Sequence, residues 1–335
     1  MQAVLTMAHG GRENLKFVAD HPKPTLGAGQ VLVRIAATAI NYHDIFTRRG
    51  MPGISIKLPI VVGSDVAGEV VELGEGVTDW PIGSRVLLNP MLRDGRFGMI
   101  GETVDGGRAE FVAVDFRQLI HIPENVSFQA AASLPLAYGT AHRMMISRGR
   151  VSAGERVLIL GASGGVGVAC LQIAKILGAT VVACASSISK LDRLANLGAD
   201  HCVDYSKSNI TDAISHLFGK PRVTGSGGVD VAINFTGGET WKDTQRCVRL
   251  GGRILTCGAT AGYEVNTDVR YLWTFEHNVI GSNGWRDDDL RALLALISEG
   301  SLCPAIDRVL PLEEAAEAER LLEDREVVGK VLLQP

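Results

Sequence analysis

Residues 157–167 read VLILGASGGVG, a run of four branched apolar residues that stops on a cluster of glycines. An apolar run bounded by glycine predicts a strand buried on both faces, as in a parallel sheet covered by helices. From Val166 the apolar residues recur at helical spacing as far as Leu177, and Gly178 suits the position that ends a helix. A second apolar run follows at 180–185. Strand, glycine-rich turn, helix and strand together predict a dinucleotide-binding unit, in which N–H groups at a helix N-terminus bind a pyrophosphate.

The glycine-rich turn supplies the first expected cofactor contacts. It follows a strand and opens a helix, which is the context that a nucleotide-binding turn requires. Gly164 and Gly167 match the last two glycines of G-x-G-x-x-G, whereas Ala162 takes the place of the first. An ordinary tight turn is the alternative for glycines of this kind. The residues expected to bind the phosphates are Ser163, Gly164, Gly165, Val166 and Gly167.

The end of the second strand indicates which nucleotide binds. An NAD site carries an acid at this point, and that acid would repel the 2′-phosphate of NADP. Residues 185–190 read ASSISK, which contains no acid but offers hydroxyl groups and one cation. Ser186 and Lys190 therefore favour NADP(H), with a solvated surface lysine as the alternative for Lys190. Tyr205 is a further candidate for this pocket, with a partly buried core position as its alternative.

Composition excludes several classes of protein. The 335 residues suit two domains, and no apolar run approaches the roughly 18 residues that a membrane span needs. The N-terminal residues reach a charge by Arg12, unlike a signal peptide. A net charge of -4 without long runs of one sign gives no electrostatic case for nucleic acid or a membrane surface. Six cysteines without a C-x-x-C pair are consistent with a reducing compartment, so we expect a cytoplasmic protein that acts on a small molecule.

The pattern of strands and helices divides the chain. Up to about residue 125, short β-rich runs with Gly and Pro turns predict a barrel-like β domain. At least four later strands alternate with helices, which predicts an open, mostly parallel sheet. The chain ends in a β-rich run that we expect to return to the first domain. The expected domains are residues 1–135, residues 136–283 and a C-terminal return at 284–335.

Four further motifs carry a resemblance that covers essentially the whole chain. They are GSDVAG at 63–68, LPLAYGTA at 134–141, LGG at 250–252 and GKVL at 329–332. Together with the glycine-rich turn, they resemble the medium-chain dehydrogenase/reductase superfamily. The resemblance implies an α/β fold: a Rossmann-type doubly wound parallel sheet plus a GroES-like β-barrel catalytic domain.

The positions of the zinc ligands differ from those of the zinc-dependent members. Those members carry a Cys, a Gly-His-Glu and a second Cys at three places that Asn41, Ser64 and Leu136 hold here. An amide, a hydroxyl and an alkyl group cannot replace the Cys and His ligands that catalytic zinc needs. Residues 91–107 also contain no cysteine for a structural zinc lobe. We therefore expect no metal.

The sequence NYHD at residues 41–44 resembles the Asn-x-x-Asp of the zinc-free quinone oxidoreductase-like branch, whose members are NADPH-dependent. Without a Lewis acid, charge that develops on the single oxygen of a simple ketone is poorly stabilised. A quinone or α,β-unsaturated carbonyl spreads that charge, so hydrogen-bond donors can suffice. The sequence thus predicts a zinc-independent, NADPH-dependent reductase of quinones or activated alkenes. The alternatives are an aldehyde or ketone reductase resembling alcohol dehydrogenases, and a non-catalytic NADPH-binding sensor.

The candidate catalytic residues lie in two motifs. Asn41 is the expected hydrogen-bond donor to the acceptor, with a strand-end residue that bonds its own backbone as the alternative. Tyr42 and His43 are candidate proton donors. On an extended segment their side chains would point to opposite faces, so we expect at most one of them to act, or water instead. Asp44 is expected to orient this loop, and Thr140 matches the family's threonine near the nicotinamide ribose.

Residues at later strand ends and in the connecting segment complete the expected site. In doubly wound folds the nicotinamide half of the cofactor lies at such strand ends. The further residues expected to bind the cofactor are Cys257, Gly258, Ala259, Ser282, Asn283 and Lys330, the last by its match to a family lysine and with an exposed strand position as its alternative. The expected substrate pocket comprises Leu136, Tyr138 and Trp285. The resemblance also implies a homodimer or homotetramer, with the strand near Val279 as a pairing edge.

Overall fold

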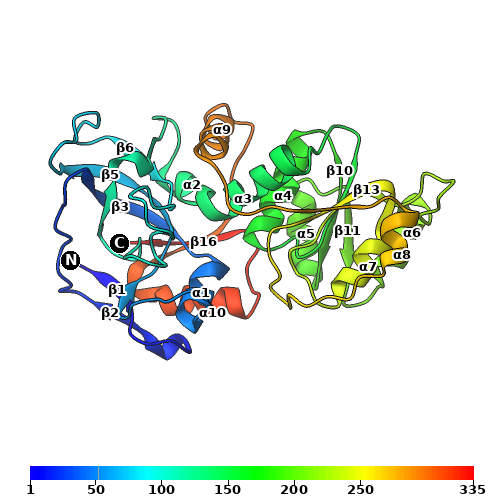
Figure 1. Cartoon of the computed structure of the whole chain (residues 1–335), viewed down its shortest axis with the longest axis horizontal. Helices are drawn as coiled ribbons and strands as arrows, with labels where there is room; N and C mark the ends of the chain where they lie inside the picture. Colours follow the sequence, from blue (N-terminus) through cyan, green and yellow to red (C-terminus); the bar gives the residue numbers. More distant parts are fainter. Residues whose placement is uncertain (52) are drawn as a thin grey trace. The chain divides into compact units, whose positions relative to one another are not determined.

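The chain forms two compact units in a computed structural model that describes residues 1–51 and 53–335 (Figure 1). Unit 1 comprises Met1–Ala137 and Asp287–Pro335, and unit 2 comprises Tyr138–Arg286. These bounds lie next to the domain boundaries that the sequence predicts. Within the described ranges, no helix combines the length and apolarity that crossing a membrane requires.

Unit 2 is built on a six-stranded parallel sheet in the order β11-β10-β9-β12-β13-β14. The first strand in sequence, β9, lies in the middle, so the strand order reverses between β9 and β12. Ligands of such sheets bind outside the carboxyl ends of the strands at this reversal. The strands are β9 (Arg156–Ile159), β10 (Thr180–Ala185), β11 (His201–Asp204), β12 (Val229–Ile233), β13 (Val248–Thr256) and β14 (Asn278–Gly281).

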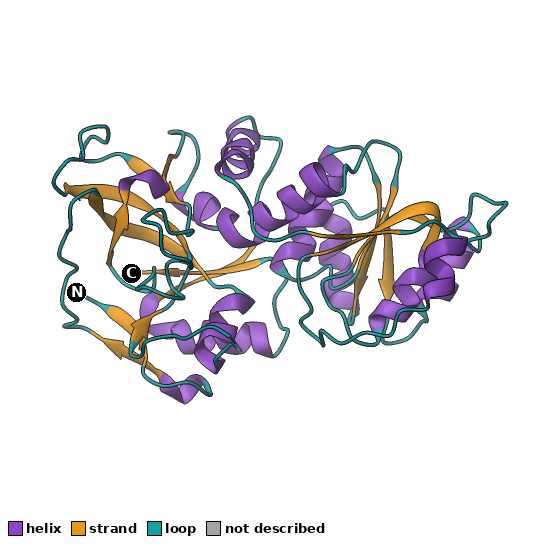
Figure 2. Ribbon diagram, in the orientation of Figure 1, coloured by secondary structure: helices purple, strands orange, loops and turns teal. Residues whose placement is uncertain are grey.

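Helices lie on both sides of this sheet (Figure 2). The helix after the glycine-rich turn spans Gly165–Ile176, and Gly178 follows it with a φ of 79°, so the expected helix end is confirmed. The α-helices of unit 2 are α3 (Gly139–His142), α4 (Gly165–Ile176), α5 (Ile188–Asn196), α6 (Ile210–Phe218), α7 (Thr240–Cys247) and α8 (Val269–Thr274), and a π-helix spans Arg143–Arg148.

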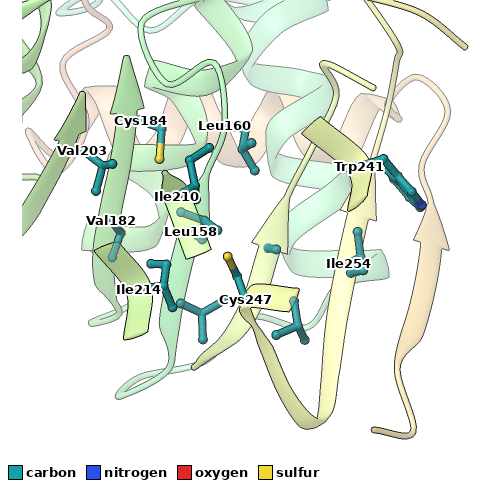
Figure 3. Close-up of a cluster of buried hydrophobic side chains, with 13 residues drawn as sticks. Leu158, Leu160, Val182, Cys184, Val203, Ile210, Ile214, Trp241, Cys247 and Ile254 are labelled. Carbon is teal, nitrogen blue, oxygen red and sulfur yellow. The ribbon is translucent and has the colours of Figure 1, made fainter. Parts of the chain in front are cut away.

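Figure 3 shows a core cluster that fixes the sheet of unit 2 against α6. Leu158, Val182 and Ile254 come from three different strands and have no exposed surface. Ile210 and Ile214 of α6 belong to the same cluster. Burying each such side chain contributes about 1.5–3 kcal/mol. The cluster therefore holds strands that are distant in sequence at one level, which sets where their carboxyl ends lie.

Unit 1 contains a seven-stranded sheet in the order β15-β16-β3-β5-β6-β8, with β7 paired to β3, and a smaller sheet in the order β2-β1-β4. The outer strands of the long path, β8 and β15, each have one partner. The strand pairs of the described residues leave this path open between β8 and β15. The strands are β1 (Ala3–Thr6), β2 (Leu15–Val18), β3 (Gln30–Ala39), β4 (Ile60–Val61), β5 (Asp65–Leu73), β6 (Arg85–Leu88), β7 (Phe111–Asp115), β8 (Leu119–His121), β15 (Ile306–Pro311) and β16 (Lys330–Gln334).

The end of the chain lies in the sheet of unit 1. Strand β16 pairs antiparallel with β3, where Leu332 is opposite Ala39, and parallel with β15. This pairing brings residues near position 330 beside residues near position 40. The α-helices of unit 1 are α1 (Tyr42–Arg49), α2 (Phe128–Ala132), α9 (Asp287–Ser298) and α10 (Ala315–Glu323).

The edge strand β14 has one partner strand among the described residues, β13. Val279 on this strand is 46% exposed, and Trp273 of the nearby helix α8 is 65% exposed. An unpaired edge with apolar residues is a natural pairing surface. The homodimer or homotetramer stays a prediction, which the mass of the protein in solution would test.

A buried ion network fastens α10 to the rest of unit 1. Arg48 of α1 donates from Nε to Glu319 of α10 over 2.6 Å, and Arg108 donates to the other oxygen of the same carboxylate. All three residues have no exposed surface. Burial alone would raise the pKa of Glu319, but the two guanidinium groups hold this pKa below its ordinary value. The carboxylate is thus the shared partner of two buried cations.

Replacing Glu319 with Gln leaves Arg48 and Arg108 without their shared negative charge. Removing one partner of a buried ion pair costs about 3–5 kcal/mol. We expect the free energy of unfolding of unit 1 to fall by this amount in urea denaturation of Glu319→Gln. Asp94→Asn, which breaks an exposed pair with Arg96, is the control and should leave the midpoint unchanged. Equal midpoints for Glu319→Gln and the wild type would contradict the assignment.

Candidate active site

Asn41 lies at the point where strand β3 ends and helix α1 begins. It is the N-cap residue of the helix, with φ −124° and ψ 155°. Its backbone N–H donates to Oδ2 of Asp44 over 2.9 Å. A carboxylate three residues after the N-cap commonly accepts this bond, because it satisfies an N–H that the helix leaves free. Asp44 thus orients the Asn41 turn, and its own burial raises its pKa although Arg108 acts in the opposite direction.

The segment after Asn41 is helical, which corrects the extended geometry expected for it. Tyr42 and His43 are the first two residues of α1, so their side chains are separated by about 100° around the helix rather than by a half-turn. The ring of Tyr42 packs edge-on against Phe46 one turn later, with centroids 5.2 Å apart. The spacing of Asn41 and Asp44 is itself a helix-start signal that predicts this geometry.

The side-chain amide of Asn41 is held by a buried cation. Lys330 of β16 is 2% exposed, and its Nζ donates to Oδ1 of Asn41 and to the carbonyl oxygen of Ile40. Nδ2 of Asn41 donates to Oγ of Ser64 over a long 3.5 Å. The alternative of an exposed strand position for Lys330 is therefore wrong. Whether Lys330 also contacts the cofactor stays a prediction.

Asp65 links the three residues at the positions where zinc-dependent members carry their ligands. It contacts Ser64 and Leu136 directly and Asn41 through Lys330. Its carboxylate accepts from Nζ of Lys330 at 3.3 Å, from Oγ of Ser64 at 3.3 Å and from the backbone N–H of Leu136 at 3.0 Å. Asn41, Ser64 and Leu136 therefore do converge in space. Their amide, hydroxyl and alkyl groups do not fit catalytic zinc, and an ammonium group supplies the positive charge beside them. Nowhere in residues 1–51 and 53–335 do three or more His, Cys, Asp or Glu side chains form a metal-binding group.

His43 forms an ion pair that the sequence did not predict. Its Nε2 lies 2.7 Å from Oε2 of Glu102, whose side chain is 6% exposed while that of His43 is 27% exposed. Burial alone would lower the pKa of His43, but the hydrogen bond to Glu102 and the charges of Asp44 and Asp65 hold it above its ordinary value. The ion pair therefore favours the charged form of an imidazole that is partly exposed to solvent.

The turn at residues 161–167 of unit 2 has the form of a phosphate site. Gly164 is the N-cap of α4 and has no side chain to satisfy the helix. The N–H groups of Gly165, Val166 and Gly167 therefore have no acceptor within the helix. A Cβ on Gly167 would lie 2.4 Å from the carbonyl oxygen of Gly161, so this close approach requires glycine. These features fit the pyrophosphate of a dinucleotide, and Ser163 lies within the same turn.

The residues expected to select the nucleotide lie at or near the end of β10. The strand ends at Ala185, and α5 begins at Ile188, so Ser186 lies in the turn between them and Lys190 in the first turn of the helix. The backbone N–H of Tyr205 donates to the carbonyl oxygen of Ala185 over 3.2 Å, which places Tyr205 beside this turn. Tyr205 is 41% exposed, so the core alternative for it is wrong.

The carboxyl ends of β13 and β14 border a cavity of about 390 Å³. Four of the expected cofactor residues line it, whereas Ala259 does not. Burial raises the pKa of the Cys257 thiol to about 12, so this cysteine is not a nucleophile at neutral pH. The residues that line the cavity are Arg143, Arg148, Thr256, Cys257, Gly258, Gly281, Ser282 and Asn283.

The remaining site residues lie in the connecting segment and at the end of unit 2. Thr140 of α3 is 8% exposed. Tyr138 is fully buried, and its hydroxyl donates to Oε1 of Gln172 in α4 over 2.6 Å, so packing against α4 accounts for it. Leu136 and Trp285 are half-buried. Their places in a substrate pocket stay predictions.

Three residues that the structure places at these sites were not indicated by any sequence motif. Glu102 lies in the segment 91–107, which the sequence marks only by its lack of cysteine. Arg143 and Arg148 follow the motif that contains Thr140, but as single basic residues in a helical stretch they read as surface charges. No local pattern marks any of the three as a site residue, because the acid at 102 stands between Gly101 and Thr103 rather than in an apolar run.

Two family models match the chain. The alcohol dehydrogenase GroES-like domain matches residues 27–124, and the zinc-binding dehydrogenase family matches residues 165–299. Similar known proteins include the quinone oxidoreductase of Rattus norvegicus, 31% identical over 99% of this chain and 97% of that protein. The chloroplastic NADPH-dependent alkenal/one oxidoreductase of Arabidopsis thaliana is 32% identical over 100% of this chain and 80% of that protein. The acryloyl-coenzyme A reductase of Metallosphaera sedula is 30% identical over 99% of both chains.

Solved structures show the same similarity. An NAD-dependent alcohol dehydrogenase is 37% identical with a TM-score of 0.92, and the match covers 100% of both chains. The 2-octenoyl-CoA carboxylase reductase CinF, in complex with NADP and 2-octenoyl-CoA, is 29% identical with a TM-score of 0.86 over 99% of this chain and 87% of that one. The expected combination of a GroES-like domain and a Rossmann-type parallel sheet is thereby confirmed.

Replacing Glu102 with Gln should lower the pKa of His43, because the ion pair that favours the charged imidazole is lost. This pKa is raised in the folded wild type, so the pair stabilises the protein fully below the unfolded pKa of histidine and less as pH rises through the folded pKa. The variant should lack that pH-dependent stability. NMR titration of the His43 ring measures the pKa, with the other histidine signals as internal controls. An unchanged pKa in Glu102→Gln would refute the pairing.

Proposed function

The chain belongs to the medium-chain dehydrogenase/reductase superfamily, in its zinc-free quinone oxidoreductase-like branch, and we propose that it reduces activated alkenes or quinones with NADPH. One observation carries this proposal: Asn41, Ser64 and Leu136 converge on Asp65 and Lys330 without offering a metal-ligand set. A site that stabilises developing charge with hydrogen-bond donors suits an acceptor whose charge is delocalised.

Residues of unit 2 would hold the cofactor. NADPH supplies the hydride when bound. The free N–H groups of Gly165, Val166 and Gly167 would bind its pyrophosphate. Ser186 and Lys190 would bind the 2′-phosphate, since the turn after β10 offers a hydroxyl and a cation and no acid. Support for NADPH also comes from the Arabidopsis relative and from the CinF complex, whereas the NAD-dependent alcohol dehydrogenase makes cofactor choice a point to test.

Asn41 is the proposed donor to the oxygen of the acceptor. Lys330 donates to Oδ1 of Asn41, which draws electron density from the amide and strengthens Nδ2–H as a donor. The contact from Nδ2 to Ser64 is long, so this hydrogen can turn to a stronger acceptor at low cost. A preorganised donor of this kind is worth most where charge develops in the transition state.

His43 is the proposed source of the proton that completes the reduction. The ion pair with Glu102 raises the pKa of its imidazole and so favours the charged form, and its partial exposure allows it to take up a new proton from solvent after each turnover. Delivery to the carbon of a conjugated acceptor gives a saturated carbonyl compound. Tyr42 packs against Phe46 and has no comparable ion pair within the described ranges.

The two competing functions make different predictions about acceptors. An aldehyde or ketone reductase would consume NADPH with a saturated ketone as fast as with its α,β-unsaturated analogue. A sensor would bind NADPH tightly but would not oxidise it, whichever acceptor is supplied. The quinone, alkenal/one and acryloyl-coenzyme A activities in the names of the relatives support the conjugated acceptor. Absorbance of NADPH with 3-penten-2-one, 2-pentanone and a benzoquinone separates the three.

Replacing Asn41 with Ala removes the donor but not the cofactor site. Losing one donor of an oxyanion site typically costs about 10²–10³ in kcat. We expect that loss for hydride transfer to 3-penten-2-one in single-turnover kinetics, while the Kd of NADPH stays within about twofold. Asn266→Ala, at an exposed position in unit 2, is the matched control. Wild-type turnover in Asn41→Ala would remove this residue from the mechanism.

Replacing Lys190 with Gln tests the choice of cofactor. A hydrogen bond to a charged group is worth about 1.5–3 kcal/mol, so the Kd of NADPH should rise roughly tenfold or more. The Kd of NADH should not change, because NADH has no 2′-phosphate. Fluorescence titration measures both constants, and Lys242→Gln on the exposed face of α7 is the control. Equal weakening of NADPH binding and NADH binding would show that Lys190 does not contact the 2′-phosphate.

A further inference from the structure

Asn234 is the first residue after strand β12, and its side chain has no exposed surface. Its Oδ1 accepts from the backbone N–H of Thr236 over 3.0 Å and from that of Gly237 over 2.9 Å. Its Nδ2 donates to Oγ1 of Thr240 over 3.0 Å and to Oγ1 of Thr244 over 2.8 Å. This buried amide therefore joins the turn that follows it to helix α7.

The two threonine hydroxyls donate to other oxygens, which leaves them to accept from the amide. Oγ1 of Thr244 donates to the carbonyl oxygen of Thr240 over 2.8 Å. Oγ1 of Thr240 lies 2.7 Å from the carbonyl oxygen of Gly237, closer than the 3.4 Å to Oδ1 of Asn234. A hydroxyl has one hydrogen to donate, so each threonine meets Nδ2 as an acceptor. The amide thus serves the turn as an acceptor and the helix as a donor.

The turn after β12 lies beside the glycine-rich turn. Strand β12 pairs with β9, and the backbone N–H of Leu160 donates to the carbonyl oxygen of Ile233 over 3.0 Å. A Cβ on Gly161 would lie 3.3 Å from Oγ1 of Thr236 and 3.4 Å from the ring of Phe235. The strand order reverses between β9 and β12, and ligands of such sheets bind at the reversal. The turn after β12 therefore lies at this ligand-binding place, next to the residues expected to bind the pyrophosphate.

The turn after β12 is also bonded to the turn after β13. The N–H of Ala261 donates to the carbonyl oxygen of Thr236 over 2.8 Å, and the N–H of Gly238 donates to that of Gly262 over 2.9 Å. Gly237 has a φ of 70°, and a Cβ on it would collide with the carbonyl oxygen of Gly262, so this close approach requires glycine. The amide that holds Gly237 thus supports both turns at the carboxyl end of the sheet.

We propose that Asn234 is a positioning residue for the nicotinamide half of the cofactor. The adenosine half is expected on one side of β9, at the turn after β10, whereas β12 and β13 lie on the other side. The two turns that Asn234 supports therefore lie on the side left for the nicotinamide. Asn234 acts through the backbone of these turns and not by contact with the cofactor. The choice of NADPH as this cofactor rests on the proposed function.

Loss of the Asn234 amide affects the two halves of the cofactor unequally. Without Oδ1, the N–H groups of Thr236 and Gly237 lose their acceptor, so the turn adopts other arrangements for part of the time. A ligand that needs the native arrangement then binds more weakly, in proportion to the fraction of molecules that retain it. The turn after β10 lies two strands away from β12, so binding of the adenosine half should not change.

Binding of NADPH and of its fragment 2′,5′-ADP tests this role without any reaction. The fragment has the adenosine and the 2′-phosphate but no nicotinamide. In calorimetric titrations of the full-length protein, Asn234→Ala should raise the Kd of NADPH about tenfold, because two buried N–H groups lose their acceptor. The Kd of 2′,5′-ADP should stay within about twofold, which also shows that the variant is folded. Asn125→Ala, which removes an exposed amide bonded to Ser298 in unit 1, is the matched control and should change neither Kd.

Two further variants separate the support of the turn from general damage to the core. Asn234→Asp retains an oxygen for the two N–H groups but cannot donate to the threonines, so it should bind NADPH more tightly than Asn234→Ala does. Gly237→Ala leaves the amide in place but forces the turn away from Gly262, so it should weaken NADPH and spare 2′,5′-ADP. This variant decides the question if Asn234→Ala does not fold.

Three results would overturn the positioning role. One is unchanged NADPH binding in Asn234→Ala, and another is an equal loss of NADPH and 2′,5′-ADP in Asn234→Ala or in Gly237→Ala. The third is a loss of NADPH binding in Asn234→Asp as large as that in Asn234→Ala, since it would assign the effect to the threonine contacts instead of the turn.

A parallel titration with NADH and 5′-ADP separates this role from the proposed function. If the wild type binds NADH but not NADPH, and Asn234→Ala weakens NADH while sparing 5′-ADP, the positioning role stands and NADPH is the wrong cofactor. If NADPH binding depends on Asn234 as expected but neither 3-penten-2-one nor a benzoquinone is reduced, the positioning role stands and the proposed reaction fails. A wild type that binds neither dinucleotide would overturn both.

Discussion

The buried ammonium of Lys330 is the charge on which the arrangement of unit 1 depends. Removing an ammonium from water costs several kcal/mol unless oxygens replace its hydration. Here the carbonyl oxygen of Ile40, the amide oxygen of Asn41 and the carboxylate of Asp65 surround it. Lys330 is 289 residues from Asn41 in sequence, and it reaches this place because β16 pairs with β3. The position of the Asn41 amide is thus set by the last strand of the chain.

The ion network around Glu319 also helps to fix the position of Asn41. Arg108 lies between Glu319 and Asp44, with Nη2 3.4 Å from the carboxylate of Asp44. Asp44 in turn accepts from the N–H of Asn41. Two buried sets of charged groups therefore hold Asn41. Lys330 donates to its side-chain oxygen, and Arg108 lies beside Asp44, which accepts from its backbone N–H. This double attachment restricts the amide more than a single hydrogen bond could, which is what a preorganised donor requires.

Charge is distributed differently in the two units. In unit 1 each buried cation has carboxylates beside it, and even the half-exposed His43 is paired with Glu102. In unit 2 the N–H groups of Gly165, Val166 and Gly167 at the start of α4 have no acceptor within the helix, and no acid lines the cavity that Arg143 and Arg148 border. The buried cations Arg48, Arg108 and Lys330 of unit 1 are thus paired with carboxylates of the same unit, whereas the N–H groups at the start of α4 are open to negative charge from a ligand.

The sequence by itself determined the features that depend on neighbouring residues. The run at 157–167, the helix that ends at Gly178 and the missing acid after Ala185 all follow from local patterns of apolar residues, glycine and charge. The helical start at Asn41 was also encoded in its spacing to Asp44, although we expected an extended segment. Only the tertiary structure decided that Lys330 is buried, that Glu102 pairs with His43 and that Arg143 borders a cavity. These contacts join segments that strand order and packing bring together, and no local periodicity specifies which distant side chain will be the neighbour.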